Sequence, residues 1–110
     1  MLFIKLDELE QKEPFPGCRM RFVHSENMTL AYWHITPGEP VPAHSHHHEQ
    51  VVNVIEGKFE MTVGEKTRIL ESGSVVVIPP DVIHGGKALT DCRIIDVFYP
   101  VREDFRYTDD

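Results

Sequence analysis

Apolar and polar residues alternate along most of this chain, in short segments that turn residues separate. The alternating segments run over residues 19–24, 28–36, 46–55, 59–63, 66–70 and 92–99. A period of two is typical of β-strands that bury one face and expose the other. Residues 74–78, by contrast, read SVVVI, and this continuous apolar run predicts a strand that is buried on both faces.

Glycine, proline and short acidic clusters end these segments and predict turns between the strands. Residues 1–13 show mixed spacing that fits either a short helix or an edge strand, and Pro14 and Pro16 are expected to end that element. About eight to ten short strands with frequent turns predict an all-β sandwich or barrel. An antiparallel barrel would leave few exposed strand edges and could enclose one small ligand.

Length, charge and the two cysteines restrict the class of protein further. The length of 110 residues predicts a single domain over residues 1–110. The net charge of −7 argues against a nucleic-acid partner and against binding to an anionic membrane surface. No apolar run approaches the ~20 residues of a membrane helix, and the start MLFIKLDELEQKE is too charged for a secretory signal. Cys18 and Cys92 lie far apart and are expected to be thiols. These features predict a soluble, cytoplasmic protein that binds a small molecule.

The most informative stretch reads GEPVPAHSHHHEQVVNVIEG, in which four histidines precede an alternating segment. On an extended strand His44, His46 and Gln50 would point to one side, as the ligands of one metal must. His47 has the opposite parity, and His48 is expected to lie at the rim of the site. A solvated loop or an affinity tag would also contain histidines, but this cluster is internal and is interrupted by a serine. Imidazole and amide ligands suit one divalent transition metal, and nickel, zinc, manganese and iron all tolerate them.

A second stretch, GSVVVIPPDVIH, ends in His84. Taken alone, this is a single histidine after an apolar strand, for which a structural role in the core is usual. Together with the first stretch, it resembles the two motifs of a small single-domain cupin. The first motif, G-x5-H-x-H-x3/4-E-x6-G, is matched by Gly38, His44, His46 and Gly57, with Gln50 where glutamate is more frequent. The second motif, G-x5-P-x-G-x2-H-x3-N, is matched by Gly73, Pro79 and His84, while Asp81 and Ala88 depart from it.

The resemblance to cupins implies a double-stranded β-helix, which is a jelly-roll barrel. It also implies that His44, His46, Gln50 and His84 are the metal ligands. Glutamine in place of glutamate would leave the ligand set uncharged, so that the bound metal is a stronger Lewis acid. Small cupins of this type form dimers, and the resemblance therefore implies a homodimer.

Asp96 lies on the same face of the last alternating segment as Ile94 and Phe98. Its carboxylate would either bond to a neighbouring loop or face the barrel interior near the metal. In the interior, burial would raise its pKa and the cation would lower it. Such a group can move a proton during catalysis.

Arg102 follows this segment and has two possible roles. It would either form a surface ion pair with Glu103 or Asp104, or bind a substrate carboxylate through its forked guanidinium. The tail over residues 96–105, together with HSHHHEQ, is similar to the KdgF-type cupins of pectin and alginate breakdown, which open unsaturated uronates to linear keto sugars. This resemblance implies that Asp96 is catalytic and that Arg102 binds the carboxylate.

The function that we expect is therefore a metal-dependent, non-redox isomerase that acts on an unsaturated uronate or a related anionic sugar. Phe98, Tyr32, Trp33 and His48 are expected to line its substrate pocket. Three alternatives fit the same ligands: a metal-dependent dioxygenase, a polyketide-cyclase-like cupin, and a non-catalytic module that binds or senses a small molecule.

Overall fold

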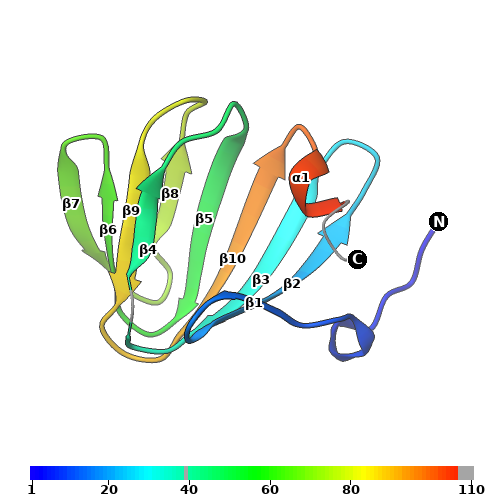
Figure 1. Ribbon diagram of the computed structural model, residues 1–110, viewed down its shortest axis with the longest axis horizontal. Helices are drawn as coiled ribbons and strands as arrows, with labels where there is room; N and C mark the ends of the chain where they lie inside the picture. Colours follow the sequence, from blue (N-terminus) through cyan, green and yellow to red (C-terminus); the bar gives the residue numbers. More distant parts are fainter. Residues whose placement is uncertain (39, 107–110) are drawn as a thin grey trace.

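The computed structural model describes residues 1–38 and 40–106, which form ten β-strands and two short helical turns (Figure 1). In chain order the elements are η1 (Leu6–Glu8), β1 (Lys12–Phe15), β2 (Cys18–His24), β3 (Thr29–Ile35), β4 (Val41–His44), β5 (Glu49–Glu56), β6 (Phe59–Val63), β7 (Lys66–Leu70), β8 (Val75–Ile78), β9 (His84–Ala88), β10 (Cys92–Tyr99) and α1 (Glu103–Arg106). Within these described ranges, no helix is long and apolar enough to cross a membrane.

The strands form two antiparallel sheets. The larger sheet has the strand order β1-β2-β3-β10-β5-β8, and the smaller sheet has the order β4-β9-β6-β7. In Figure 1 the smaller sheet lies at the left, and the larger sheet extends through β10 and β3 to β2 at the right. From β3 onward the chain crosses repeatedly between the two sheets. This arrangement confirms the predicted all-β double-stranded β-helix, or jelly roll.

The core lies between the sheets, and β10 is a central strand of the larger sheet. β10 pairs with β3 on one side and with β5 on the other. Its alternate residues Cys92, Ile94, Asp96 and Phe98 are all buried, as the period of two predicted. Cys92 and Ile94 join a cluster that includes residues from both sheets, and Phe98 joins a second cluster with Met20 and Ala31 of the larger sheet. Burial of this shared apolar surface is the main force that holds the two sheets together.

The single strand that the sequence predicts over residues 46–55 is instead two strands in different sheets. β4 ends at His44 in the smaller sheet, and β5 begins at Glu49 in the larger sheet. The connection between them is held in place because the carbonyl of His46 accepts a hydrogen bond of 2.8 Å from the N–H of Asp81. The histidines of this stretch therefore do not share one strand face, and the crossing between the sheets arranges them instead.

Two other expectations differ from the structure, and both concern strands at the edge of a sheet. The SVVVI strand is not buried on both faces, because Val75 and Val77 of the edge strand β8 point to the outer face of the larger sheet, where each is 59% exposed. Pro14 does not end an element but lies inside β1. β1 is the other edge strand of the same sheet, and proline is tolerated there because an edge strand has N–H positions without a partner strand.

Two of the motif glycines, Gly57 and Gly73, give a matched test of this fold. Both have positive φ, at 93° and 92°, but an added Cβ would collide with the carbonyl of Asp91 only at Gly57, whereas Gly73 faces open space. We predict that Gly73→Ala lowers the free energy of unfolding by about 1–2 kcal/mol, from backbone strain alone. Gly57→Ala should lower it by about 3 kcal/mol or more, because steric overlap is added to that strain. Chemical denaturation measures both values, and equal losses would contradict the close contact.

Candidate metal centre

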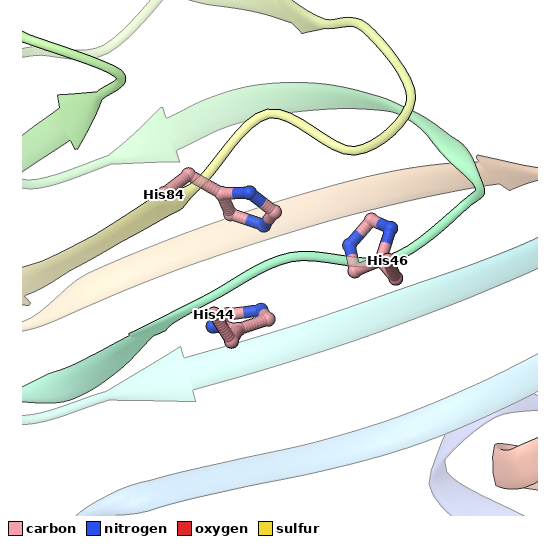
Figure 2. A group of neighbouring side chains, drawn as sticks. All are labelled: His44, His46 and His84. Atoms are coloured by element: carbon pink, nitrogen blue, oxygen red, sulfur yellow. The ribbon is translucent and has the colours of Figure 1, made fainter.

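Three histidines from both motifs lie together at one end of the jelly roll. His44 ends β4 and is paired directly with His84, the first residue of β9. His46 lies in the connection after β4. One ring nitrogen of each histidine lies within 4.8 Å of the others, so the group could hold a metal ion. Figure 2 shows the three rings gathered around a common space.

Backbone carbonyls fix which nitrogen each ring offers. The Nδ1 atom of His44 lies 2.8 Å from the carbonyl of Pro42, and that of His84 lies 2.9 Å from the carbonyl of Val82. The Nδ1 atom of His46 lies 3.1 Å from the carbonyl oxygen of the residue two positions further along the chain. A carbonyl only accepts, so each neutral ring carries its proton on Nδ1 and presents the lone pair of Nε2. Such bonds orient imidazoles for metal binding.

The contacts of these free nitrogen atoms fit a cation. The side-chain oxygen of Gln50 lies 3.0 Å from Nε2 of His46, so two atoms with lone pairs face each other. Nε2 of His84 is buried and has no hydrogen-bond partner among the described residues. A divalent transition metal among these atoms would satisfy all of them, because amide oxygen and imidazole nitrogen are both acceptable ligands. The residues present therefore fit the metal that the fold family implies.

Burial keeps two of the rings uncharged. Desolvation is the largest effect that lowers the pKa of His46 and of His84, and the positive charge of Arg102 adds to it at both rings. Metal binding requires neutral imidazole. The protein environment therefore favours the form of these side chains that binds a metal.

Asp96 lies next to this group, on β10, with only 7% of its surface exposed. Burial raises the pKa of its carboxyl to about 7, while the nearby Gln50 amide, the Trp33 indole and the charge of Arg102 offset part of the rise. Neither Oδ1 of Asp96 nor Nε1 of Trp33 makes a hydrogen bond of good geometry within the described residues. The carboxyl therefore has an oxygen free for a ligand, and the alternative that it bonds to a neighbouring loop finds no support.

Arg102 lies beside the same group of side chains, and hydrogen bonds and ring contacts orient its guanidinium. Its Nε and Nη2 atoms donate to the two carboxylate oxygens of Asp104, at 3.0 and 2.7 Å. Its guanidinium also stacks on the rings of Phe98 and Phe105, at 4.8 and 3.9 Å from their centroids. The predicted ion pair with an acidic neighbour thus exists, but the arginine side chain is only 9% exposed. It is a buried and oriented cation rather than a surface charge.

A cavity of about 550 Å³ connects these groups. Of the predicted site residues, its walls include His44, Gln50, His84, Asp96, Arg102, Trp33 and Phe98. His46 lines a second pocket, which shares Arg102 and Asp104 with this cavity.

Two predicted pocket residues are not part of this cavity. Tyr32 precedes Trp33 on β3 and therefore points to the opposite face of the sheet. His48 is 5% exposed and lines the second pocket, where its ring stacks on that of His47 at 3.9 Å. Both placements follow from strand geometry: alternation turns Tyr32 outward, and the break between β4 and β5 removes His48 from the strand that the sequence predicted.

Two residues that shape the site are not predicted from the sequence. The sequence indicates Asp104 only as a surface ion-pair partner of Arg102, and it assigns no role to Phe105. Both line the main cavity, and both contact the guanidinium of Arg102. The only signal for them was their place in the tail that resembles KdgF-type cupins.

Comparison with known proteins agrees with the geometry. Residues 31–98 match the family model described as a cupin domain. An uncharacterized protein of Streptomyces coelicolor is 30% identical over 102 residues, which cover 91% of this chain and 97% of that protein. The pectin degradation protein KdgF of Dickeya dadantii is 28% identical over 102 residues, 90% of this chain and 93% of that protein. The solved structure of KdgF from a Halomonas species is 28% identical with a TM-score of 0.88, and the match covers 96% of this chain and 98% of that chain.

Replacement of one histidine should separate metal binding from the fold. We predict that His84→Ala weakens binding of a divalent transition metal by at least about a hundredfold, since it removes a buried nitrogen that has no other partner. His34→Ala is the matched control, because His34 follows Trp33 on β3 and points away from the cavity. Isothermal titration and elemental analysis measure affinity and metal content. Equal metal content in both variants would contradict the proposed ligand set.

Proposed function

Because the chain belongs to the cupin family, we propose that it is a metal-dependent isomerase that opens or tautomerises an unsaturated uronate or a related sugar acid. The observation that carries this proposal is a cavity that joins two members of the three-histidine group, His44 and His84, to a buried carboxyl and an oriented guanidinium. Together these groups can polarise an oxygen, move a proton and bind a carboxylate, which a sugar acid uses when it rearranges without redox change. The similarity to a pectin degradation protein supports the substrate class.

His44, His46, Gln50 and His84 would hold one divalent transition metal. When bound, nickel, zinc, manganese or iron supplies Lewis-acid polarisation of a substrate oxygen. The ligand set has no charge of its own, because the three imidazoles are neutral and the fourth ligand is an amide. The charge of the cation is therefore not offset by its ligands, and it is available to polarise the substrate.

Asp96 would move the proton. In the proposed reaction its carboxylate accepts the proton of the anomeric hydroxyl as the ring opens, and the carboxyl then returns a proton to the enol carbon. The product is a linear keto acid with the same atoms and the same oxidation state. The apolar neighbours of Asp96, which include Val52 and Ala31 directly opposite it on the adjacent strands, keep water away from the carboxyl.

Arg102 would bind the substrate carboxylate. Asp104 already occupies the edge formed by Nε and Nη2, so the edge that contains Nη1 is the one left for substrate. Phe98 lies under the guanidinium and keeps its plane in place. A guanidinium that is held in this way loses little conformational entropy when it binds a second carboxylate.

We also propose a homodimer and a cytoplasmic location. The outer face of the larger sheet carries an aliphatic row that crosses five strands in register. Its members are Val23, Leu30, Val97, Val51 and Val77. A second copy of the chain would cover such a row, since exposed apolar patches of this kind are typical of protein interfaces. An acidic small domain of this kind would remain in the cytoplasm with its sugar-acid substrate.

Asp96→Asn should separate proton transfer from metal binding. We predict that this isosteric change lowers kcat by about 10²–10⁴-fold, because the amide cannot move a proton. Metal content should stay at the wild-type level, since Asp96 is not among the proposed ligands. The assay follows the loss of the conjugated double bond of unsaturated galacturonate by absorbance, alongside elemental analysis.

Asp91→Asn is the matched control, because the side chain of Asp91 is 68% exposed and its ion pair within the described part of the chain is with His34, away from the cavity. It should leave both measurements unchanged. Wild-type turnover by Asp96→Asn would show that the proton is carried by another group.

Arg102→Lys should change substrate affinity more than the chemical step. Lysine keeps the positive charge but loses the forked contact with a carboxylate, so we predict that KM rises about tenfold or more while kcat falls less. The control is Arg93→Lys, because Arg93 lies on the exposed face of β10. Steady-state kinetics on unsaturated galacturonate separates the two parameters, and an unchanged KM in Arg102→Lys would place the carboxylate elsewhere.

A further inference from the structure

The main cavity has two halves of different chemistry, arranged along the strands. On the larger sheet, Gln50 at the metal group is followed along β5 by the apolar Val52 and Val54. On the smaller sheet, His84 is followed along β9 by Gly86 and then Ala88. The four-residue step from Gln50 to Val54, and that from His84 to Ala88, each correspond to about 13 Å along the strand. The half around Gln50, His84 and Arg102 is called the polar half below.

The other half, called the apolar half below, has walls from both sheets. Its inward side chains are those of Met20, Ile35, Phe59, Met61 and Ile94, together with Phe15 of β1. Register places Met20 and Ile94 on either side of Trp33. The apolar half is therefore formed by a specific set of side chains, and apolar character does not extend over the whole cavity.

Within the described residues, no hydroxyl or amide side chain lines this apolar half, and the charged side chains at its edge come from the edge strand β1. Lys12 is half-buried and lies directly opposite Met20, whereas Glu13 is exposed. Glu13 is already engaged, since it accepts a hydrogen bond from the N–H of Gly17 and contacts Arg19. A sugar hydroxyl that entered the apolar half would lose its hydrogen bonds to water and find, among the described residues, only the Lys12 side chain at the edge as a partner, which is unfavourable. An aromatic ring or a branched aliphatic chain would instead lose only its contact with water.

We propose that the substrate is an acid with two parts: a carboxylate and reacting carbons in the polar half, and an aromatic or branched aliphatic group in the apolar half. The assignment of the polar half rests on the proposed function. The apolar half adds that the rest of the molecule is not a fully hydroxylated chain. The preferred substrate would then be an enol or keto acid with an apolar substituent, and unsaturated galacturonate would be a poorer substrate of the same site.

Trp33 provides a direct signal for this binding. It is the single tryptophan of the chain, lines the cavity, and lies at the boundary between the two halves beside Asp96. Its fluorescence should therefore change when a ligand enters the cavity. The probes are two acids that do not react: 3-phenylpropionate, which has an apolar ring, and galacturonate, which is a hydroxylated sugar acid. Both are titrated into the metal-loaded protein, with isothermal titration as a second measurement.

The expected result is that 3-phenylpropionate binds at least tenfold more tightly than galacturonate. Met20→Gln should remove most of this preference, because it places an amide of similar shape in the apolar half, where Met20 is 3% exposed. Met28→Gln is the matched control, since Met28 is 42% exposed and does not line the cavity. Met61→Gln serves as a second variant, and thermal unfolding shows which variants are folded.

Three results would overturn the inference: galacturonate binds as tightly as 3-phenylpropionate, neither acid binds, or the folded apolar-half variants keep the full preference. The proposed function fails separately, because its test is turnover of unsaturated galacturonate. Tight binding of 3-phenylpropionate without that turnover would keep the inference and reject the uronate. Turnover without the binding preference would keep the isomerase and reject the apolar part of the substrate.

Discussion

The antiparallel pairing of β4 with β9 is the constraint on which the rest of the site depends. It sets His44 directly opposite His84, although the two residues lie in different motifs. The two strands approach so closely that a Cβ on Gly85 would lie 3.0 Å from the Cα of Ala43. Because the residue after His84 has no side chain, the backbones can come together and the two imidazoles share one space. The carbonyls of Pro42 and Val82 then turn the Nε2 atoms toward that space.

A second set of contacts places the cation of Arg102 and the carboxyl of Asp96 beside the histidines. β10 carries Asp96 and Phe98 into the interior, and the chain then continues to Arg102, whose N–H donates to the hydroxyl of the fully buried Thr29 at 2.9 Å. Asp104 and the two phenylalanine rings hold the guanidinium. This cation lowers the pKa of the neighbouring histidines and also opposes the rise in the pKa of Asp96. The two parts of the site are therefore coupled electrostatically, through a low-dielectric interior where charges interact strongly.

The sequence predicts the fold well because local alternation and turn residues specify most strands. The strands β6, β7 and β10 have the predicted bounds, and the motif spacing identifies the jelly roll. The break between β4 and β5 escapes this reasoning, because the histidine run continues the alternating pattern of β5 without a turn residue. At this break a tertiary contact holds the chain, namely the hydrogen bond from the N–H of Asp81 to the carbonyl of His46, which no local pattern contains.

The site shows the same division between local and tertiary information. His44, His46 and Gln50 come together as predicted, yet they do so by crossing between sheets and not by strand parity. Tyr32 and Trp33 are both aromatic and adjacent, so composition does not distinguish them, and only the position of β3 in the sheet decides which one faces the cavity. The hydrogen bond that Arg102 donates to Asp104 also depends on the short turn of α1. Residue types predict the chemistry, whereas the burial of each group becomes visible only in the assembled fold.

The central claim is that imidazoles from both motifs bind one ion inside the jelly roll. X-ray absorption spectroscopy at the edge of the bound metal tests it most directly, because multiple scattering from imidazole rings reports how many histidines are ligands. The account predicts three imidazoles together with at least one oxygen ligand. A spectrum with fewer than three imidazoles, or with a sulfur ligand, would contradict it.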